Sequence, residues 1–445
     1  MNILFISLGC DKNLVDTEKM LGLLKNDGYL FTDDEESADI VVVNTCCFIG
    51  DAKEESINTI LEMAELKNTA RCRGLIVTGC LAQRYREEVM KEIPEVDACV
   101  GTTAYEDISR VIRSVLEGGR EMCYRDVNHL PDVRTSRIVT TGGHYAFLKI
   151  AEGCDKHCTY CVIPGVRGRY RSVPLERLLG EAKELARAGV KELILVAQET
   201  TVYGTDLYGE KSLPRLLREL CRICGIQWIR ILYCYPEEIT PELIETVKTE
   251  DKVCKYLDIP IQHASDRILK RMGRRTDRSQ LKSVIETLRR RIPDIVIRTT
   301  LICGFPGETK EDHEILMDFV DEMEFERLGV FAYSQEEDTP AAGFADQVDE
   351  EVKALRRDEI MELQQEISLE KSETMIGRVM EVMIEGKVAD ENAYVGRTYM
   401  DAPGVDGMVF VNTEELLMSG DFVRVKITGA LEYDLIGEMW NESAK

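Results

Sequence analysis

The chain has 445 residues, of which 44% are hydrophobic, and its formal net charge is −25. This length suits about three domains, and no apolar run is long enough to cross a bilayer. The negative charge argues against general binding of nucleic acid, whose phosphates require cations. It suits a basic protein partner, although acidity that only aids solubility is an equally plain explanation.

The first ten residues, MNILFISLGC, are apolar but are not expected to form a secretion signal. They lack a basic n-region, and the charged residues Asp11 and Lys12 follow at once. The chain holds fifteen cysteines, an odd number that cannot all pair internally. Without a signal, cysteine clusters indicate metal or redox chemistry more than disulfides, so the cytoplasm is the expected location.

Residues 1–125 alternate apolar runs with helix-like stretches. The runs ILFIS, DIVVVNT and GLIVTG suit buried strands, and stretches such as DTEKMLGLLKND suit helices. This alternation predicts a doubly wound α/β domain. Cys10, Cys46 and Cys80 each follow one of the three runs. Because the carboxyl ends of parallel strands form the ligand crevice of such a sheet, we expect these thiols, the N-terminal triad, to meet there.

Residues 140–370 repeat the alternation and predict a closed or partial (β/α) barrel of the TIM type. Six runs suit its strands: YAFLKI, ELILVA, WIRILYC, YLDIP, IVIRTTLIC and LGVFAY. A charged amphipathic helix is expected over 352–371, where apolar residues recur at helical spacing. From residue 372 to 445 the pattern changes to alternation with glycine turns, as in RVMEVMIEG and DGMVFVN, which predicts a small antiparallel β-barrel.

The stretch AEGCDKHCTYC follows the first strand of the predicted barrel, where barrel active sites lie. It places Cys154, Cys158 and Cys161, the barrel triad, in a CxxxCxxC spacing. Iron–sulfur clusters normally take four thiolates, so three would leave one iron open to a small molecule. A structural zinc site with His157 as fourth ligand is the alternative, although zinc sites usually pair two CxxC motifs or CxxC with HxxxH.

Other cysteines need separate interpretation. Single buried cysteines usually act as small hydrophobes, but three at equivalent strand ends favour a second three-cysteine cluster. Cys47 adjoins Cys46 and is the rival ligand, and the chemistry alone does not separate the two. CRIC, residues 221–224, has thioredoxin-like spacing but lies in a charged helical stretch, so we interpret it as structural. Six more are assigned to packing: Cys72, Cys99, Cys123, Cys234, Cys254 and Cys303.

The CxxxCxxC loop resembles the radical S-adenosylmethionine (SAM) enzymes. A three-cysteine domain, a radical SAM barrel and a terminal barrel of the TRAM type together resemble the methylthiotransferases, and this resemblance covers nearly the whole chain. It implies two 4Fe–4S clusters, the auxiliary one held by the N-terminal triad and the other by the barrel triad. It implies SAM in two roles, as methyl donor and as radical source, for replacement of C–H by C–SCH₃. No catalytic residue beyond the cluster ligands is expected.

The same resemblance implies contacts to SAM. Tyr160, just before the third cysteine of the loop, matches the aromatic residue near the adenine. In LICGFPGE, Ile302, Gly304 and Pro306 match the adenine-contacting segment. Gln198, at the end of the second barrel run, is a further expected contact. A glycine-and-proline loop after a strand is common, so these assignments depend on the resemblance.

The methylthiotransferases have two main branches. One modifies an isopentenylated adenosine of tRNA, and the other modifies the β-carbon of an aspartate in small-subunit ribosomal protein twelve. SLGCDKNLVDTE, RGRYRS, LYCYPEEIT, PIQHASDRILKRM and FAYSQEEDTPAA resemble the ribosomal branch, with Asp11 where the usual pattern has proline. Residues 371–445 hold seven Lys or Arg and fourteen Asp or Glu, which suits a basic ribosomal protein better than tRNA.

Partners follow from that branch. Arg167, Arg169 and Arg171 are expected to contact the substrate carboxylate; in the tRNA alternative they form a local basic patch. The expected partners are ribosomal protein twelve or the small subunit, a sulfur donor, and a reductant of flavodoxin or ferredoxin type. Neither membrane attachment nor stable tRNA binding is expected. An alternative from another class is a non-enzymatic iron–sulfur protein that binds RNA or the ribosome, which SAM cleavage to 5′-deoxyadenosine would exclude.

Overall fold

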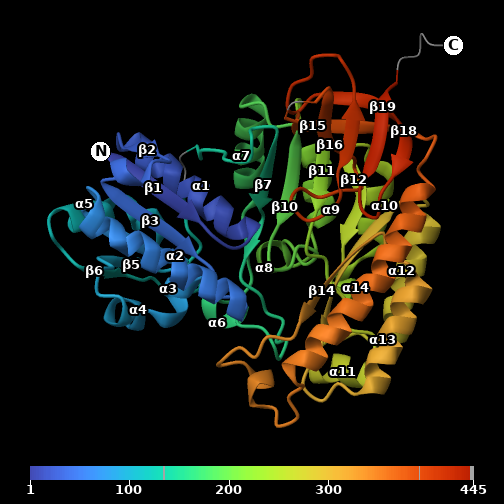
Figure 1. The fold of residues 1–445 in the computed structure, drawn as a ribbon, viewed down its shortest axis with the longest axis horizontal. Coiled ribbons are helices and arrows are strands. Elements are labelled where there is room, and N and C mark those ends of the chain that lie inside the picture. Colours follow the sequence, from blue (N-terminus) through green and yellow to red (C-terminus); the bar gives the residue numbers. More distant parts are fainter. Residues whose placement is uncertain (134–135, 390, 441–445) are drawn as a thin grey trace.

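The computed structural model of the chain describes residues 1–133, 136–389 and 391–440. Figure 1 shows three parts: an N-terminal α/β domain, a central partial barrel and a small C-terminal β-barrel. Residues 441–445, at the end of the third predicted domain, lie outside the described residues. Within the described ranges, none of the helices combines the length and the apolar character that a membrane span needs.

The N-terminal domain is a six-stranded parallel sheet in the order β2-β1-β3-β4-β5-β6. Its strands are β1 (Asn2–Ser7), β2 (Leu30–Thr32), β3 (Ile40–Thr45), β4 (Gly74–Gly79), β5 (Ala98–Val100) and β6 (Glu121–Cys123). Its α-helices are α1 (Asp11–Asn26), α2 (Gly50–Thr69), α3 (Cys80–Tyr85), α4 (Glu87–Glu92) and α5 (Ile108–Leu116). The strand order reverses at β1, which lies between β2 and β3. The predicted doubly wound sheet is confirmed, with its switch point between β1 and β3.

The central domain is a parallel sheet in the order β7-β10-β11-β12-β13-β14, and because β7 and β14 do not pair it is an open, partial barrel. Its strands are β7 (Tyr145–Lys149), β10 (Glu192–Val196), β11 (Trp228–Ile231), β12 (Val253–Asp258), β13 (Val296–Cys303) and β14 (Arg327–Ala332), and β8 (Ala151–Glu152) pairs with β9 (Arg171–Ser172) beside them. Its α-helices are α6 (Ile163–Arg167), α7 (Leu175–Arg187), α8 (Thr205–Tyr208), α9 (Leu213–Cys221), α10 (Pro241–Thr249), α11 (Asp266–Arg271), α12 (Arg278–Arg291), α13 (Lys310–Met323) and α14 (Glu350–Glu373). The six predicted strands are all present, and α14 contains the predicted helix at 352–371.

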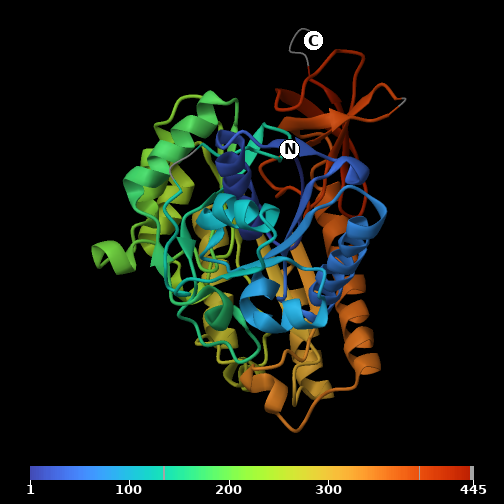
Figure 2. The ribbon, with the colours of Figure 1, turned by 90° about the vertical axis from the view of Figure 1, so that its left-hand side faces the viewer.

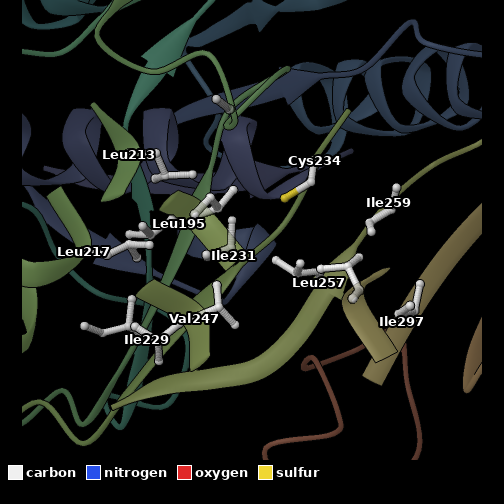
Figure 3. Close-up of a cluster of buried hydrophobic side chains, with 14 of the residues drawn as sticks. Leu195, Leu213, Leu217, Ile229, Ile231, Cys234, Val247, Leu257, Ile259 and Ile297 are labelled. Carbon is white, nitrogen blue, oxygen red and sulfur yellow. The ribbon is translucent and has the colours of Figure 1, made fainter. Parts of the chain in front are cut away.

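Alternate side chains of the barrel strands point to opposite faces. On the outer face, Leu195 of β10 packs with Leu217 of α9 in the cluster of Figure 3. On the inner face, Ile194 of β10 packs with Val15 of α1 and with Met400 of the terminal barrel. Both flanking domains therefore contribute side chains to the concave face of the sheet. Figure 2, viewed from the N-terminal side, shows the terminal barrel in red at the top.

The C-terminal domain is a closed five-stranded barrel in the order β15-β16-β17-β19-β18. Its strands are β15 (Val379–Lys387), β16 (Ala393–Arg397), β17 (Val409–Asn412), β18 (Phe422–Ala430) and β19 (Leu435–Met439). The sequence predicts an antiparallel barrel, but β17 and β19 pair in parallel. The reason is closure: a ring with an odd number of strands cannot alternate direction at every pairing.

A buried charge network fixes the terminal barrel to the central sheet. Glu192 of β10 accepts from Arg230 of β11 and from Arg397 of β16, each at 2.7 Å. Arg327 and Asp401 form a second buried pair at 2.6 Å. Removing one member would leave an uncompensated buried charge, so the terminal barrel is held in a defined position.

Candidate active site

The barrel triad lies on the loop between β8 and α6. Two backbone hydrogen bonds shape it: Cys154 N donates to Gly168 O, and Cys161 N donates to Cys158 O, each at 3.1 Å. Burial, together with the neighbouring Cys158 thiol, raises the pKa of Cys154 to about 11 and that of Cys161 to about 12. The three thiols belong to one short loop, and if they ionise, their thiolates need a cationic centre such as an iron cluster.

The N-terminal triad forms at the carboxyl ends of three adjacent strands, β1, β3 and β4. Cys10 is the N-cap of α1, Cys46 directly follows β3, and Cys80 is the first residue of α3. Gly9 (φ +88°) permits the close approach of the first two, because a Cβ there would lie 2.7 Å from Cys46 Cβ. Burial raises the pKa of Cys46 to about 12, and the thiols of Cys80 and Cys10 act in the same direction.

Cys47 has different surroundings from Cys46. It is 1% exposed and packs in the apolar core with Ile60 and Val77. Burial raises its pKa, as do the thiols of Cys80 and Cys46. Cys46 interacts with both other members of the triad, which favours it as the ligand.

The donor chemistry of both triads fits iron clusters. Among the described residues, no three His, Cys, Asp or Glu side chains converge tightly enough to hold a single metal ion. A four-iron cluster binds each thiolate to a different iron, so its ligands stand further apart than those of a mononuclear site. His157, the alternative zinc ligand, is exposed. All fifteen cysteines are free of disulfides.

A buried network extends from the N-terminal triad through Arg167, which is 2% exposed. Its Nη2 lies 3.4 Å from Cys80 Sγ, and its Nη1 lies 2.8 Å from Asp16 Oδ2 and 3.4 Å from Glu152 Oε2. Glu152 Oε1 accepts from Gln198 Nε2 at 3.1 Å. The network therefore runs from the N-terminal triad to an expected SAM contact.

The other two predicted arginines lie beside this network. Arg169 is exposed, and its backbone N–H donates to Asn128 Oδ1 at 2.9 Å. Arg171 is half-buried, and its Nη2 donates to Arg167 O at 3.1 Å. Of the three predicted arginines, Arg167 forms ion pairs with carboxylates. Arg171 donates hydrogen bonds to backbone carbonyls.

The structure brings four of the expected SAM contacts together. Tyr160 and Ile302 pack on the same small cluster around Phe305, and the rings of Tyr160 and Phe305 meet edge to face at 6.4 Å. Gly304 and Pro306 flank Phe305 on the loop that follows β13. The fifth contact, Gln198, was predicted at the end of the second barrel strand but lies two residues beyond it, because β10 ends at Val196; its Oε1 is buried without a protein partner. An unpartnered buried oxygen at this position is available to a ligand.

A second set of side chains supports this loop from behind. Glu308 accepts from Phe305 N at 3.1 Å and pairs with Arg356 at 2.9 Å. His263 is completely buried, and its Nε2 lies 3.5 Å from Glu308. Because His263 Nδ1 accepts from Ser265 N, the ring proton belongs on Nε2, facing the carboxylate. The sequence analysis did not identify this support.

Comparison with known proteins accounts for all three parts of the chain. Residues 2–101 match the uncharacterized protein family UPF0004, 148–320 match the radical SAM superfamily and 376–439 match the TRAM domain. The chain is 65% identical to ribosomal protein uS12 methylthiotransferase RimO of Lachnoclostridium phytofermentans, over 98% of this chain and 99% of that one. The RimO of Acetivibrio thermocellus is 52% identical, over 99% and 98%. The chain belongs to the RimO family.

A solved structure with a similar fold is the radical SAM methyltransferase TsrM of Kitasatospora setae. Its TM-score is 0.55 at 14% identity, over 74% of this chain and 72% of that chain, and the likeness concerns the fold alone. Membership in the RimO family implies SAM and 4Fe–4S chemistry. It confirms the resemblance and the fold class that the sequence predicts.

A cavity of about 410 Å³ lies at the junction of the first two domains of this RimO family member. Cys158 and Cys161 line one side of it, and Arg84 and Arg86 of the N-terminal domain line the other. Arg84 also pairs with Glu336 at 3.1 Å across the same junction. Two of the three thiols of the barrel triad therefore face the N-terminal domain across this cavity.

Two buried cations near the triads were missed by the sequence analysis. Lys12 is 7% exposed, and its Nζ lies 3.4 Å from the centre of the Tyr233 ring. Arg274 is 7% exposed and stacks on Tyr235, whose hydroxyl is 3.6 Å from Cys158 Sγ. Lys12 and both tyrosines lie in stretches that resemble the RimO family. The contacts of Lys12 with Tyr233 and of Arg274 with Tyr235 join residues far apart in sequence, so no local sequence pattern predicts them.

Proposed function

We propose that this chain methylthiolates the β-carbon of an aspartate in ribosomal protein uS12, with Cys10, Cys46 and Cys80 holding an auxiliary 4Fe–4S cluster and Cys154, Cys158 and Cys161 a second one. One observation carries the proposal. In this RimO family member, both cysteine triads lie at the junction of the first two domains: Cys80 contacts Arg167 of the central domain, and Cys158 and Cys161 line a cavity whose other wall is the N-terminal domain. A reaction that joins a sulfur group to a carbon radical needs both centres close to one substrate.

SAM and the clusters, when bound, supply a methyl group for sulfur and a 5′-deoxyadenosyl radical that takes hydrogen from the substrate carbon. The protein's own part is to bind and orient. The barrel triad provides three thiolates and leaves one iron position for SAM. Tyr160, Ile302, Gly304 and Pro306 form an apolar wall suited to an adenine ring. Gln198 offers a polar atom to the same ligand.

The N-terminal triad serves the sulfur half of the reaction. Its thiolates lie among buried side chains, and Arg167 places a positive charge 3.4 Å from Cys80 Sγ. A hydrogen bond to a cluster thiolate favours its charged form. Four of the six thiols are buried, which limits the access of water to a radical that would otherwise be quenched. We assign the sulfur atom to an external donor and the electrons to a reductant of flavodoxin or ferredoxin type.

The charge of the chain supports a protein substrate rather than tRNA. The last 75 residues carry twice as many acidic as basic side chains, and attraction to a basic ribosomal protein follows from Coulomb's law. tRNA would require a cationic surface. The names of the curated relatives, which act on uS12, point the same way. The cytoplasm is the compartment in which these partners meet.

Mass spectrometry of uS12 from cells with and without this protein tests the proposal. We expect a methylthio increment on one aspartate only when the protein is present. Nucleoside analysis of tRNA from the same cells is the second arm. A change confined to methylthioadenosine would overturn the ribosomal assignment, and failure of the reduced protein to cleave SAM to 5′-deoxyadenosine would overturn the enzyme class.

A further inference from the structure

The buried cations of the described residues fall into two groups. Eight lysine and arginine residues are buried. Six of them pair with a carboxylate: Lys149, Arg167, Arg230, Arg327, Lys353 and Arg397. The other two, Lys12 and Arg274, stack on Tyr233 and Tyr235. A buried cation that lacks an ion pair costs stability, so these two positions point to an anion supplied from outside the side chains, by a bound cluster, a ligand or a substrate.

Lys12 lies where the N-terminal domain meets the barrel. It is on the first turn of α1, two residues after Cys10, and its ammonium faces the ring of Tyr233 at 3.4 Å. Tyr233 follows β11 at its carboxyl end, the end at which barrel active sites form. The neighbouring acid, Asp11, forms no ion pair with Lys12; its carboxylate accepts the Tyr233 hydroxyl at 3.1 Å and attracts the ammonium only from a greater distance.

Tyr233 has a strained backbone conformation. Its φ of +60° lies in the left-handed region, which non-glycine residues rarely adopt. Asp258 Oδ2 accepts its backbone N–H at 3.0 Å, and Thr200 donates to its carbonyl at 3.0 Å. The backbone is thus fixed so that the ring supports the Lys12 ammonium, an arrangement suited to presenting a cation to a ligand.

The proposed reaction requires a cation between the two triads, to bind the carboxylate of the substrate aspartate. The reacting β-carbon of aspartate carries a carboxylate one bond away. That carbon must lie between the barrel triad, beside which SAM is cleaved, and the N-terminal triad, which holds the sulfur group. A carboxylate buried in that interval requires a charged hydrogen-bond donor. Lys12 lies beside the N-terminal triad at the end of a barrel strand, and among the described residues it is in no ion pair with a carboxylate.

We propose that Lys12 binds the side-chain carboxylate of the substrate aspartate and so determines which residue of uS12 reacts; this inference rests on the proposed function. Arg167 fits the role less well, because Asp16 and Glu152 already match its charge. Arg169 is exposed. Lys12 acts as a specificity-determining residue: it selects a carboxylate over an amide at the reacting side chain.

The test compares two forms of uS12, one with the target aspartate and one with asparagine in its place, for anaerobic binding to the cluster-loaded enzyme. The wild-type enzyme should bind the aspartate form at least about tenfold more tightly. Lys12→Met has nearly the same shape without the charge, and it should bind both forms equally. Lys12→Arg should keep the preference. Lys19→Met, on the same helix but paired with Glu181, is the matched control and should behave as the wild type.

Each outcome has one meaning. Iron content and SAM cleavage by the reduced variants establish that they are folded and loaded. If Lys12→Met keeps the preference for aspartate while the wild type methylthiolates uS12, the inference is wrong and the proposed function stands. A preference that is intact in Lys12→Met, with a shifted reduction potential of the auxiliary cluster, would assign Lys12 to cluster charge instead. If the wild type does not modify uS12, both proposals fail.

Discussion

Arg167 donates from Nη2 to the Cys80 sulfur at 3.4 Å, while its Nη1 lies 2.8 Å from Asp16 Oδ2. Asp16 belongs to α1 and Arg167 to α6, so this pair joins the first two domains beside the N-terminal triad. Lys149 also pairs with Asp16, and Glu152 contacts both cations. The network holds two charges of each sign, all buried, and is neutral only when it is complete.

Replacing Arg167 with Met should therefore affect both stability and cluster chemistry. One cation would remain for two buried carboxylates, so we expect the free energy of unfolding to fall by about 3 kcal/mol. Loss of a positive charge beside a cluster thiolate should also lower the reduction potential of the auxiliary cluster. Thermal unfolding measures the first effect, and potentiometric titration followed by electron paramagnetic resonance measures the second.

The control for this prediction is Arg169→Met, two residues away and exposed. It should change neither the unfolding temperature nor the potential of either cluster. If Arg167→Met unfolds earlier but leaves the auxiliary potential where it was, the guanidinium is structural and does not act on the cluster.

The choice between Cys46 and Cys47 is open to a direct test. Wild-type protein reconstituted without oxygen should hold about eight irons, four per cluster. Cys46→Ala should hold about four, because Cys46 interacts with both Cys10 and Cys80. Cys47→Ala should keep all eight and lose only packing in the apolar core. Iron assay and Mössbauer spectroscopy of the two variants decide the matter, and loss of iron from Cys47→Ala alone would reverse the assignment.

The strands that the sequence predicts are those with an unbroken apolar run. β3 and β4 are buried along their whole length, and short runs rich in Val, Ile and Leu are typical of buried parallel strands. β2, β5 and β6 were not predicted because each has three residues, too few to show a period. The parallel pairing of β17 with β19 results from the closure of a five-stranded barrel, and the sequence of a single strand does not show how the barrel closes.

In the candidate site, too, local features could be predicted from the sequence and contacts between distant residues could not. The places of the six cysteines could be predicted, because each follows a strand or belongs to one short loop. Their role as cluster ligands stays a prediction. The contacts of Arg167 and Lys12 could not be predicted. Arg167 is matched by Asp16 from another domain, and Lys12 owes its position to Tyr233 at the end of a distant strand. Such partners are set by domain packing, which leaves no periodic trace in the sequence.

Gly304 is predicted to be essential for the SAM loop. Its φ is +68°, and a Cβ there would lie 3.0 Å from Lys353 Cβ and 3.2 Å from its Cα, on the buried face of α14. Gly304→Ala must therefore shift the loop as well as strain it. We expect the dissociation constant for SAM to rise at least about tenfold, measured by equilibrium binding to cluster-loaded protein.

The matched control is Gly189→Ala. Gly189 also has a positive φ, +104°, but has no neighbour within 4 Å. Alanine there should cost about 1–2 kcal/mol of backbone strain and leave SAM affinity unchanged. Equal loss of SAM affinity in both variants would show that strain alone, and not contact with Lys353, weakens the site.

Asp312 gives the chain a specific sensitivity to acid. It caps α13 by accepting from Thr309 N at 2.9 Å and from Ser265 Oγ at 2.6 Å, and it pairs with Arg267. Burial alone would raise its pKa, but the hydrogen bonds from Ser265, Thr309 and Arg267 lower it to about 2. The folded pKa lies below the ordinary value of 3.8, so the ionised carboxylate stabilises the folded state at neutral pH.

That stabilisation is complete above about pH 4 and is lost as the pH falls toward about 2. Asp312→Asn should therefore lower the free energy of unfolding by roughly 2 kcal/mol at pH 6. The difference between variant and wild type should shrink between pH 4 and pH 2, as followed by circular dichroism of cluster-free protein. Asp318→Asn, exposed on the same helix, is the control and should show no pH-dependent difference. If the difference in the free energy of unfolding between Asp312→Asn and wild type stayed constant down to pH 2, the charge of the carboxylate would contribute nothing. Asp312 would then stabilise the fold only by its packing.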